Sequence, residues 1–230
     1  MKKNKPTIAI LCGGKGLRLR PITVDTPKPL IEIGSKPILQ YIINHFKSYK
    51  NYEYLIATGY KSKQIEKFMR DEFHAVNYKI INSGDVQIIE RIKDIIDSAN
   101  NKDIVLCYGD TISNVDLDKL TKFHHKDLNS VTITSYPINI PFGVMKINKN
   151  NMVQSFVEKP MLDDVMNIGY FYISKSLFND FYKYNSFEEV LVNLAKKKKL
   201  KCYQHKGIHI TINTIKELEY ANENIKKIFK

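Results

Sequence analysis

The sequence contains few cysteines and no long apolar segment. Its three cysteines, Cys12, Cys107 and Cys202, are odd in number and widely spaced, which excludes a disulfide framework and the usual metal-binding spacings. The apolar run after the basic N-terminus is broken by Gly13 and Gly14, so it is too short for a signal peptide or a membrane span. These absences indicate a protein of the reducing cytoplasm that has no membrane partner.

Acidic residues are also comparatively scarce. The chain carries 24 Asp and Glu against 36 Lys and Arg, which gives a net charge of +12. A basic chain favours anionic partners, namely nucleic acid, an anionic membrane surface or phosphorylated small molecules. The lysines are scattered among Asn and Ile, without the interleaved basic and aromatic stripe of nucleic-acid-binding proteins. A nucleic-acid-binding module is therefore disfavoured, and phosphorylated small molecules are the better candidates.

Strand-like and helix-like segments alternate through the first half of the chain. Continuous apolar runs predict buried strands, and apolar residues at helical spacing predict amphipathic helices. The predicted strands cover residues 7–12, 54–58, 78–81 and 104–108, and the predicted helices cover 36–49, 61–72 and 86–99. This alternation is typical of an α/β fold in which helices cover both faces of a mostly parallel sheet. Ligands of such sheets collect at the carboxyl ends of the strands.

The second half of the chain is richer in strands. A turn cluster at residues 148–151 predicts a hairpin, and Ser186 with Glu189 and Thr214 with Glu217 fit capping boxes of two later helices. The predicted strands cover residues 131–136, 143–147, 153–157 and 169–173. We find no repeat and no linker, so we expect one Rossmann-like domain over residues 1–230, with a small antiparallel excursion in its second half.

The strongest motif occupies residues 11–29 and begins at Leu11, near the end of the first predicted strand. Gly13, Gly14 and Gly16 lack a Cβ, so their backbone N–H groups can ring a phosphate. Arg18 adds a planar guanidinium, and Lys28 stands between two prolines that stiffen the backbone around its charge. The Gly-Lys-Ser/Thr of a P-loop is missing. The motif predicts a loop that holds a nucleoside triphosphate, and a plain turn with a rigid surface loop is the alternative.

This motif resembles the signature of the sugar-phosphate nucleotidyltransferase family, with Leu17 in place of the usual Thr. The resemblance continues through residues 36–37 (Lys-Pro), 108–110 (Tyr-Gly-Asp), 142–143 (Phe-Gly), 156–160 (Phe-Val-Glu-Lys-Pro) and 167–170 (Asn-Ile-Gly-Tyr). It implies a glycosyltransferase-A-like fold. It also implies transfer of a nucleoside monophosphate to a phosphorylated small molecule, with release of pyrophosphate. The nucleotide is then expected to bind to residues 7–115 and the acceptor to residues 130–215.

The resemblance implies catalytic roles for Arg18 and Lys28 at the triphosphate and for Asp110 as a ligand of Mg²⁺. The chemistry supports these roles, because transfer between two anionic phosphates depends on positioning and on charge cancellation. Mg²⁺ also needs a carboxylate, which Asp110 offers at the end of a predicted strand. Further nucleotide contacts are expected at Ser83, Gly84, Gln87 and Gly109. Acceptor contacts are expected at Gly143, Glu158, Lys159, Asn167 and Gly169.

Within the family, the pattern is similar to that of the glucose-1-phosphate cytidylyltransferases, which act in cell-surface polysaccharide biosynthesis. The similarity implies CTP as the nucleotide and a hexose 1-phosphate as the acceptor. Two features depart from the pattern. Asn213 stands where the family places a second Mg²⁺-binding Asp, and its amide offers a carbonyl oxygen without charge, or else caps the last helix. Residues 87–91 (Gln-Ile-Ile-Glu-Arg) replace a Thr-Gly-Gly-Arg run.

These departures leave the acceptor open. Phosphoglutamine or phosphocholine with CTP, or a heptose 1-phosphate with GTP, are alternatives to the hexose 1-phosphate. Because of Asn213, a catalytically dead nucleotide-binding subunit is a further alternative. The sequence also leaves open whether the chain forms a homo-oligomer.

Overall fold

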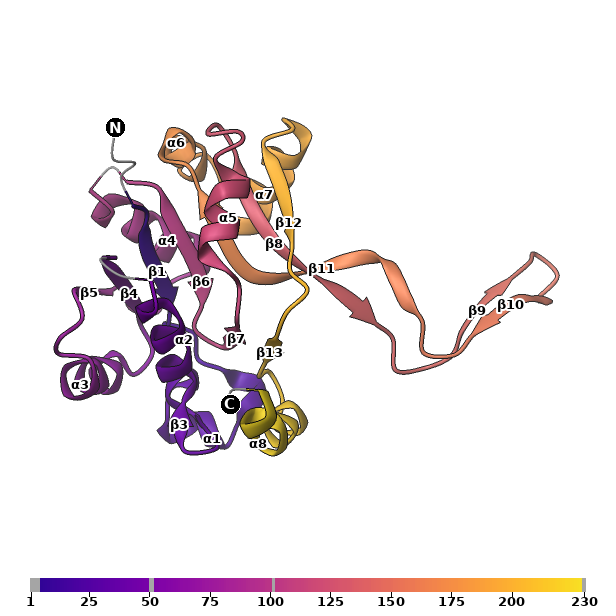
Figure 1. Ribbon diagram of the computed structural model, residues 1–230, viewed down its shortest axis with the longest axis horizontal. Helices are drawn as coiled ribbons and strands as arrows, with labels where there is room; N and C mark the ends of the chain where they lie inside the picture. The colour runs from indigo at the N-terminus through magenta and orange to yellow at the C-terminus, as the bar shows by residue number, and fades with distance from the viewer. Residues whose placement is uncertain (1–4, 50–51, 101, 229–230) are drawn as a thin grey trace.

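A seven-stranded sheet forms the centre of the molecule (Figure 1). The computed structural model describes residues 5–49, 52–100 and 102–228. In spatial order the strands are β12 (Leu200–Gln204), β8 (Val131–Asn139), β11 (Met161–Ile173), β6 (Ile104–Tyr108), β1 (Thr7–Leu11), β4 (Tyr54–Thr58) and β5 (Tyr78–Asn82). Neighbouring strands pair in parallel, except that β11 runs antiparallel to both β6 and β8. The predicted mostly parallel, mixed sheet is confirmed.

Helices cover both faces of this sheet, as the alternating pattern predicts. Successive side chains of a strand point to opposite faces, so Ile8 and Ile10 of β1 enter one apolar core while Ala9 enters the other. The first core is covered by α2 (Ile38–Lys47), α3 (Ser62–Glu72), α5 (Leu117–His124) and α8 (Ile215–Ile228). The second is covered by α4 (Ile88–Ser98), α6 (Phe178–Phe181) and α7 (Phe187–Lys196). No helix in the described ranges is long and apolar enough to cross a membrane.

Short elements complete the fold. Two small antiparallel pairs join β2 (Glu32–Ile33) to β3 (Lys36–Pro37) and β7 (Thr111–Ser113) to β13 (His209–Thr211). One-turn helices lie at Leu17–Leu19, Lys28–Leu30 and Lys175–Leu177, together with the short α1 (Ile22–Asp25). Sequence patterns did not predict α5, β7, β12 or β13, because these elements are short and most of them carry too few apolar residues to show a period.

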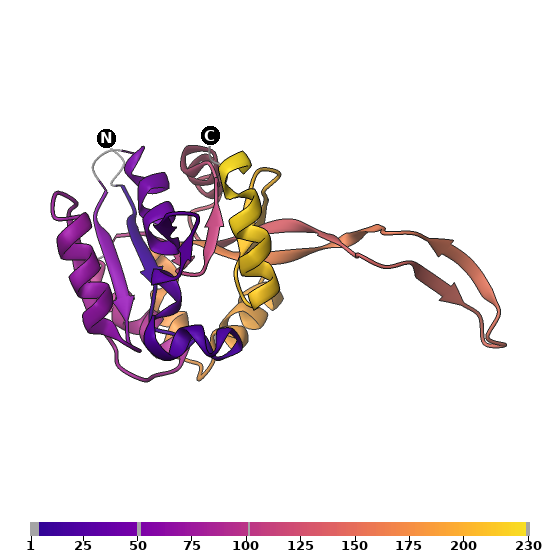
Figure 2. The ribbon, with the colours of Figure 1, turned by 90° about the horizontal axis from the view of Figure 1, so that it is seen from below.

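The predicted hairpin is confirmed and belongs to a longer feature. Strands β9 (Val144–Ile147) and β10 (Val153–Val157) pair antiparallel around a turn at residues 148–151. The hairpin continues the end of β8 and the first half of β11, which begins at Met161 instead of the expected residue 169. We call residues 139–167 the arm. Figures 1 and 2 both show the arm projecting from one side of the sheet, away from the helices.

Candidate active site

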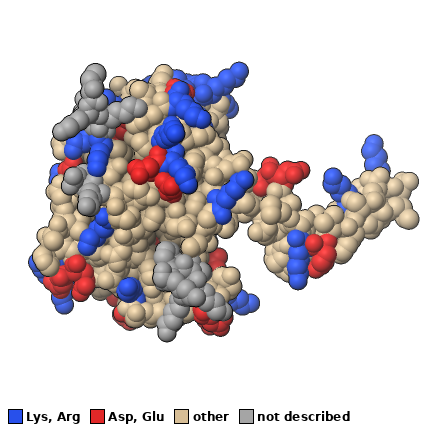
Figure 3. Space-filling view, in the orientation of Figure 1, with Lys and Arg blue, Asp and Glu red and all other residues tan. Residues whose placement is uncertain are grey.

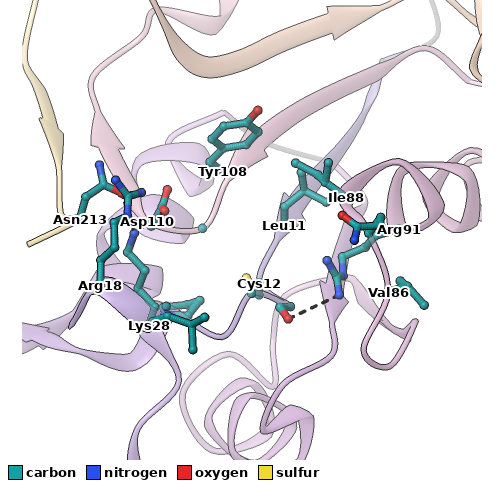
Figure 4. Close-up of a pocket in the computed structure, with 17 residues that line it drawn as sticks. Leu11, Cys12, Arg18, Lys28, Val86, Ile88, Arg91, Tyr108, Asp110 and Asn213 are labelled. Carbon is teal, nitrogen blue, oxygen red and sulfur yellow. Dashed lines mark hydrogen bonds and ion pairs between the residues drawn. The ribbon is translucent and has the colours of Figure 1, made fainter. Parts of the chain in front are cut away.

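A cavity of about 590 Å³ opens at the carboxyl ends of β1 and β6. This volume lies in the range of sites for small molecules, and the position is the one expected for ligands of a parallel sheet. The cavity is lined by Leu11, Cys12, Gly13, Gly14, Gly16, Leu17, Arg18, Lys28, Pro29, Val86, Gln87, Ile88, Arg91, Tyr108, Gly109, Asp110 and Asn213 (Figure 4). The structure therefore brings most of the predicted nucleotide-binding residues to one wall.

The glycine-rich loop leaves β1 and folds against its own neighbours. Gly16 adopts a left-handed φ of 62°, which a residue with a Cβ rarely adopts, and its carbonyl accepts a hydrogen bond from Thr23 Oγ1 at 3.0 Å. A Cβ on Gly13 would overlap the guanidinium of Arg91. Glycine at these two positions lets the loop pass close to other groups and keeps its backbone at the cavity.

Four polar side chains converge at one end of the cavity. Lys28 Nζ lies 2.6 Å from Asp110 Oδ2 and donates a hydrogen bond to Asn213 Oδ1 at 3.0 Å. Arg18 Nη2 donates to the same Asn213 oxygen at 2.8 Å. The Lys28 side chain is 10% exposed, so its charge is little screened by water. Figure 4 shows these groups pointing toward one another, which makes a compact basic cluster with one carboxylate.

Pairing of β7 with β13 places Asn213 in this cluster. The backbone N–H of Ile212 donates to the carbonyl of Asp110 at 3.3 Å, so residue 213 follows beside the carboxylate. The helix cap belongs to Thr214, whose Oγ1 accepts from the N–H of Glu217 while Glu217 Oε2 accepts from the N–H of Thr214 at 2.8 Å. This is the predicted capping box, and it leaves the Asn213 side chain directed at the cavity.

Arg91 is a cavity residue to which the sequence assigned no role. Its guanidinium donates to the carbonyls of Gly84 at 3.0 Å, Thr58 at 3.4 Å and Gly13 at 3.4 Å. Arg91 is 6% exposed, and this burial lowers the pKa of its guanidinium from the usual value. Its position between apolar residues on the inner face of α4 was the available signal. Arg91 therefore links the glycine-rich loop by hydrogen bonds to the end of β4 and to the segment that follows β5.

The remaining predicted nucleotide contacts divide into two groups. Gln87 and Gly109 line the cavity, whereas Ser83 and Gly84 lie outside its lining. The carbonyl of Gly84 accepts from Arg91, and the Oγ of Ser83 is buried without a hydrogen-bond partner. These two residues are thus not part of the cavity lining, and Gly84 is linked to the cavity through Arg91.

The predicted acceptor residues lie in two places. Gly169 has a φ of 75°, and a Cβ there would come 2.5 Å from Tyr108 Cδ2; Asn167 Oδ1 accepts from its N–H at 2.8 Å. Both residues therefore lie beside Tyr108, whose burial, together with Asp110, raises its pKa to about 12. Three others, Gly143, Glu158 and Lys159, lie on the arm and not in the cavity lining of their own chain.

Oxygen donors for a metal are limited at this site. The described residues contain no group of three or more His, Cys, Asp or Glu that could hold a metal ion. Asp110 supplies the one carboxylate of the cavity lining, and Asn213 supplies an amide oxygen beside it. A cation held here would need further oxygens from a bound ligand or from water.

Comparisons with known proteins agree with this fold. Residues 8–228 match the model of the nucleotidyl transferase family. A Bacillus subtilis protein named as a probable glucose-1-phosphate cytidylyltransferase is 32% identical over 93% of this chain and 94% of its own length. A Campylobacter jejuni D-glycero-alpha-D-manno-heptose 1-phosphate guanylyltransferase is 33% identical over 83% of this chain and 86% of its own. The chain belongs to the nucleotidyl transferase family.

A solved structure supports the same fold. UDP-glucose pyrophosphorylase, complexed with UDP-glucose, aligns with a TM-score of 0.77 and 17% sequence identity, over 97% of this chain and 99% of that chain. The fold and the family that the sequence motifs predict are therefore both confirmed.

Proposed function

We propose that this protein transfers a cytidylyl group from CTP to a phosphorylated small molecule, with a hexose 1-phosphate as the acceptor. The observation that carries the proposal is the cluster of Arg18, Lys28, Asp110 and Asn213 beside the glycine-rich loop in one cavity. Backbone N–H groups and two cations suit a triphosphate, and a carboxylate suits the metal that accompanies it. The name of the Bacillus subtilis relative supports cytidine as the base.

The reaction requires charge cancellation more than proton transfer. A phosphate oxygen of the acceptor attacks the α-phosphorus of CTP, the bond from that phosphorus to the bridging oxygen breaks, and pyrophosphate leaves. The attacking phosphate is already ionised near neutral pH, so no general base is needed. Lys28 and Arg18 would move from Asp110 and Asn213 to the phosphate oxygens, where they stabilise the charge that develops in the transition state.

We also propose that Mg²⁺ accompanies the triphosphate. Asp110 would hold it, with phosphate oxygens and water filling the other positions, and Asn213 would offer an uncharged carbonyl oxygen. Mg²⁺ is commonly held by one or two carboxylates and the substrate phosphates, which suits a cavity with one carboxylate. The ion would supply positive charge at the reacting phosphates.

One specific observation favours a second candidate. The Campylobacter jejuni relative is named for a heptose 1-phosphate and a guanylyl group, and its identity to this chain is similar. The cavity lining includes Gln87, Ile88 and Arg91, which belong to the segment 87–91 that departs from the cytidylyltransferase pattern. GTP with a heptose 1-phosphate is therefore the alternative to test beside CTP.

The test is a turnover screen of the four nucleoside triphosphates. Each would be combined with Mg²⁺ and with glucose 1-phosphate, a heptose 1-phosphate, phosphocholine or phosphorylated amino acids, and pyrophosphate release would be measured. We expect the highest kcat/KM with CTP and a hexose 1-phosphate, together with a rise of Tm when CTP binds. Absence of both turnover and a Tm shift with every triphosphate would contradict the proposal.

A further inference from the structure

The arm has no core of its own. No residue between 139 and 167 is buried, although the ribbon carries many large apolar side chains. Those exposed by more than half include Phe142, Met145, Ile147, Met152, Val153, Phe156, Val157 and Met161. A two-stranded ribbon is marginally stable in water, and apolar patches of this kind mark interaction surfaces. The arm is therefore built to pack against another surface.

The charge of the arm indicates what kind of surface that is. Its three lysines and three acidic residues cancel, whereas the whole chain has a net charge of +12. Figure 3 shows basic side chains spread over the body, whereas along the arm both blue and red side chains are present. A neutral arm gains nothing from a polyanion or an anionic membrane, so its apolar side chains suit a protein surface.

The cavity lacks a cation that is free to bind the acceptor phosphate, whereas the arm carries one. Every lining residue comes from residues 11–110 or is Asn213, and its cations are already engaged by Asp110, Asn213 and backbone carbonyls. Transfer needs a further cation for the phosphate of the acceptor. Lys159 forms no ion pair within the described residues and has a left-handed φ of 48°, a strained conformation that is typical of functional positions.

Lys159 directly follows a pair of arm residues, Phe156 and Glu158, that gather beside Gly143. A Cβ on Gly143 would come 2.5 Å from Phe156 Cζ and 3.0 Å from Glu158 Oε2, so the absence of a side chain lets these two groups lie against the backbone just before β9. An apolar ring and a carboxylate thus lie together here, and Lys159 is the next residue along the chain; such groups can bind the hydroxyl and phosphate groups of a small acceptor.

We propose that the arm of one copy docks at the cavity of a second copy and supplies Lys159 and Glu158 to the acceptor bound there. The inference rests on the proposed function. A second copy suits the arm because the cavity lining offers matching apolar side chains: Leu17 is 57% exposed and Val86 is 39% exposed. In a symmetric pair each arm reaches the cavity of the other copy, so both sites are completed at once.

Mixing two variants, each with little activity when the acceptor is kept well below its wild-type KM, tests the exchange. Asp110→Asn keeps the arm and disables the cavity, whereas Lys159→Ala keeps the cavity and disables the arm. When equal amounts are unfolded and refolded together, random pairing leaves about a quarter of the sites with an intact cavity and an intact arm. We expect about a quarter of wild-type activity from the mixture. Lys149→Ala, which removes the same charge from the turn of the arm, is the matched control and should stay active.

Sedimentation provides an independent measurement that needs no turnover. We expect the wild type to form a dimer or a larger closed assembly, and Phe156→Asp to shift it to monomer while its circular dichroism stays unchanged. A wild type that is active and monomeric, or a mixture with no recovered activity, would overturn the exchange and leave the proposed function standing. A wild type that turns over no substrate would overturn the proposed function, and a monomeric mass would then overturn the arm proposal separately.

Discussion

The body of the molecule and the arm contain similar apolar residues but bury them differently. In the body, strand side chains such as Ile10 and Leu106 are completely buried beneath helices on the two faces of the sheet. In the arm, Phe156 and Met145 are more than half exposed. One strand shows both conditions, since β11 is exposed up to Asn167 and buried from Ile168 onward.

This difference separates two tasks. The body alone supplies the glycine-rich loop, the cation cluster and Asp110, all held by neighbouring strands and helices. The arm supplies a surface rich in exposed apolar side chains, with the carboxylate of Glu158 beside Gly143 and Lys159 next in the sequence. Under our account the body binds the nucleotide, while the arm joins copies together and contributes to the acceptor site.

The largest expected effect is the difference in stability loss between a substitution in the body and one in the arm. Ile10→Ala should lower the free energy of unfolding by about 2–5 kcal/mol, because it leaves a cavity in a closed core. Phe156→Ala should change the unfolding of the dilute monomer by about 0.5 kcal/mol or less, with an effect that grows at higher protein concentration. Urea unfolding at two concentrations measures both. Equal losses in the dilute protein would break the distinction between body and arm.

Lys28 tests the cation cluster of the body. Lys28→Met should lower kcat by about 10²–10³-fold, since a cation at the reacting phosphates is lost. Lys15→Met is the matched control on the same loop, because Lys15 is half exposed and pairs with Asp85 at the surface. The control should keep its kcat within about twofold. If both variants lose activity equally, the cluster has no special role.

Asn213 tests the metal within the same cluster. Asn213→Asp adds a carboxylate beside Asp110 and should lower the Mg²⁺ concentration needed for half-maximal activity by about tenfold. Asn213→Ser, which lacks both the charge and the carbonyl oxygen, is the comparison variant. The measurement is turnover against Mg²⁺ concentration. An unchanged Mg²⁺ dependence in Asn213→Asp would show that residue 213 does not face the metal.

His124 concerns the buried half of β11 and affects stability only at acidic pH. Its ring stacks on Tyr172 at 3.9 Å, and burial, followed by the charges of His125 and Lys201, lowers its pKa to about 3. An unfolded histidine has a pKa of about 6.5, so the unfolded state takes up the proton first as the pH falls. Stability is then full above about pH 6.5 and declines toward pH 3, by at most about 1.4 kcal/mol per pH unit.

The comparison for this pH effect is His124→Gln. Its unfolding free energy should fall less steeply between pH 6.5 and 4 than that of the wild type, by about one proton in the slope. Urea unfolding at a series of pH values gives both slopes. Parallel curves would show that His124 titrates normally in the folded protein.

The sequence predicted the body better than the arm. Strand and helix periods located the elements around β1, β4 and β6 because each has a buried face. The glycine-rich motif predicted Lys28 and the Tyr-Gly-Asp segment predicted Asp110, and both residues line one cavity. The exposed first half of β11 has no buried face, so no period marked it. The bonds from Arg91 to three carbonyls depend on tertiary contacts that no local pattern encodes.

The variant Lys159→Ala tests most directly whether the body binds the nucleotide while the arm serves the acceptor. If the arm serves the acceptor, this variant should raise the KM for the acceptor phosphate by about 10–100-fold, the value of a hydrogen bond to a charged group, while the KM for CTP stays within about twofold. Steady-state kinetics with each substrate varied in turn gives both constants. A KM for CTP that rises as much as that for the acceptor would contradict the account.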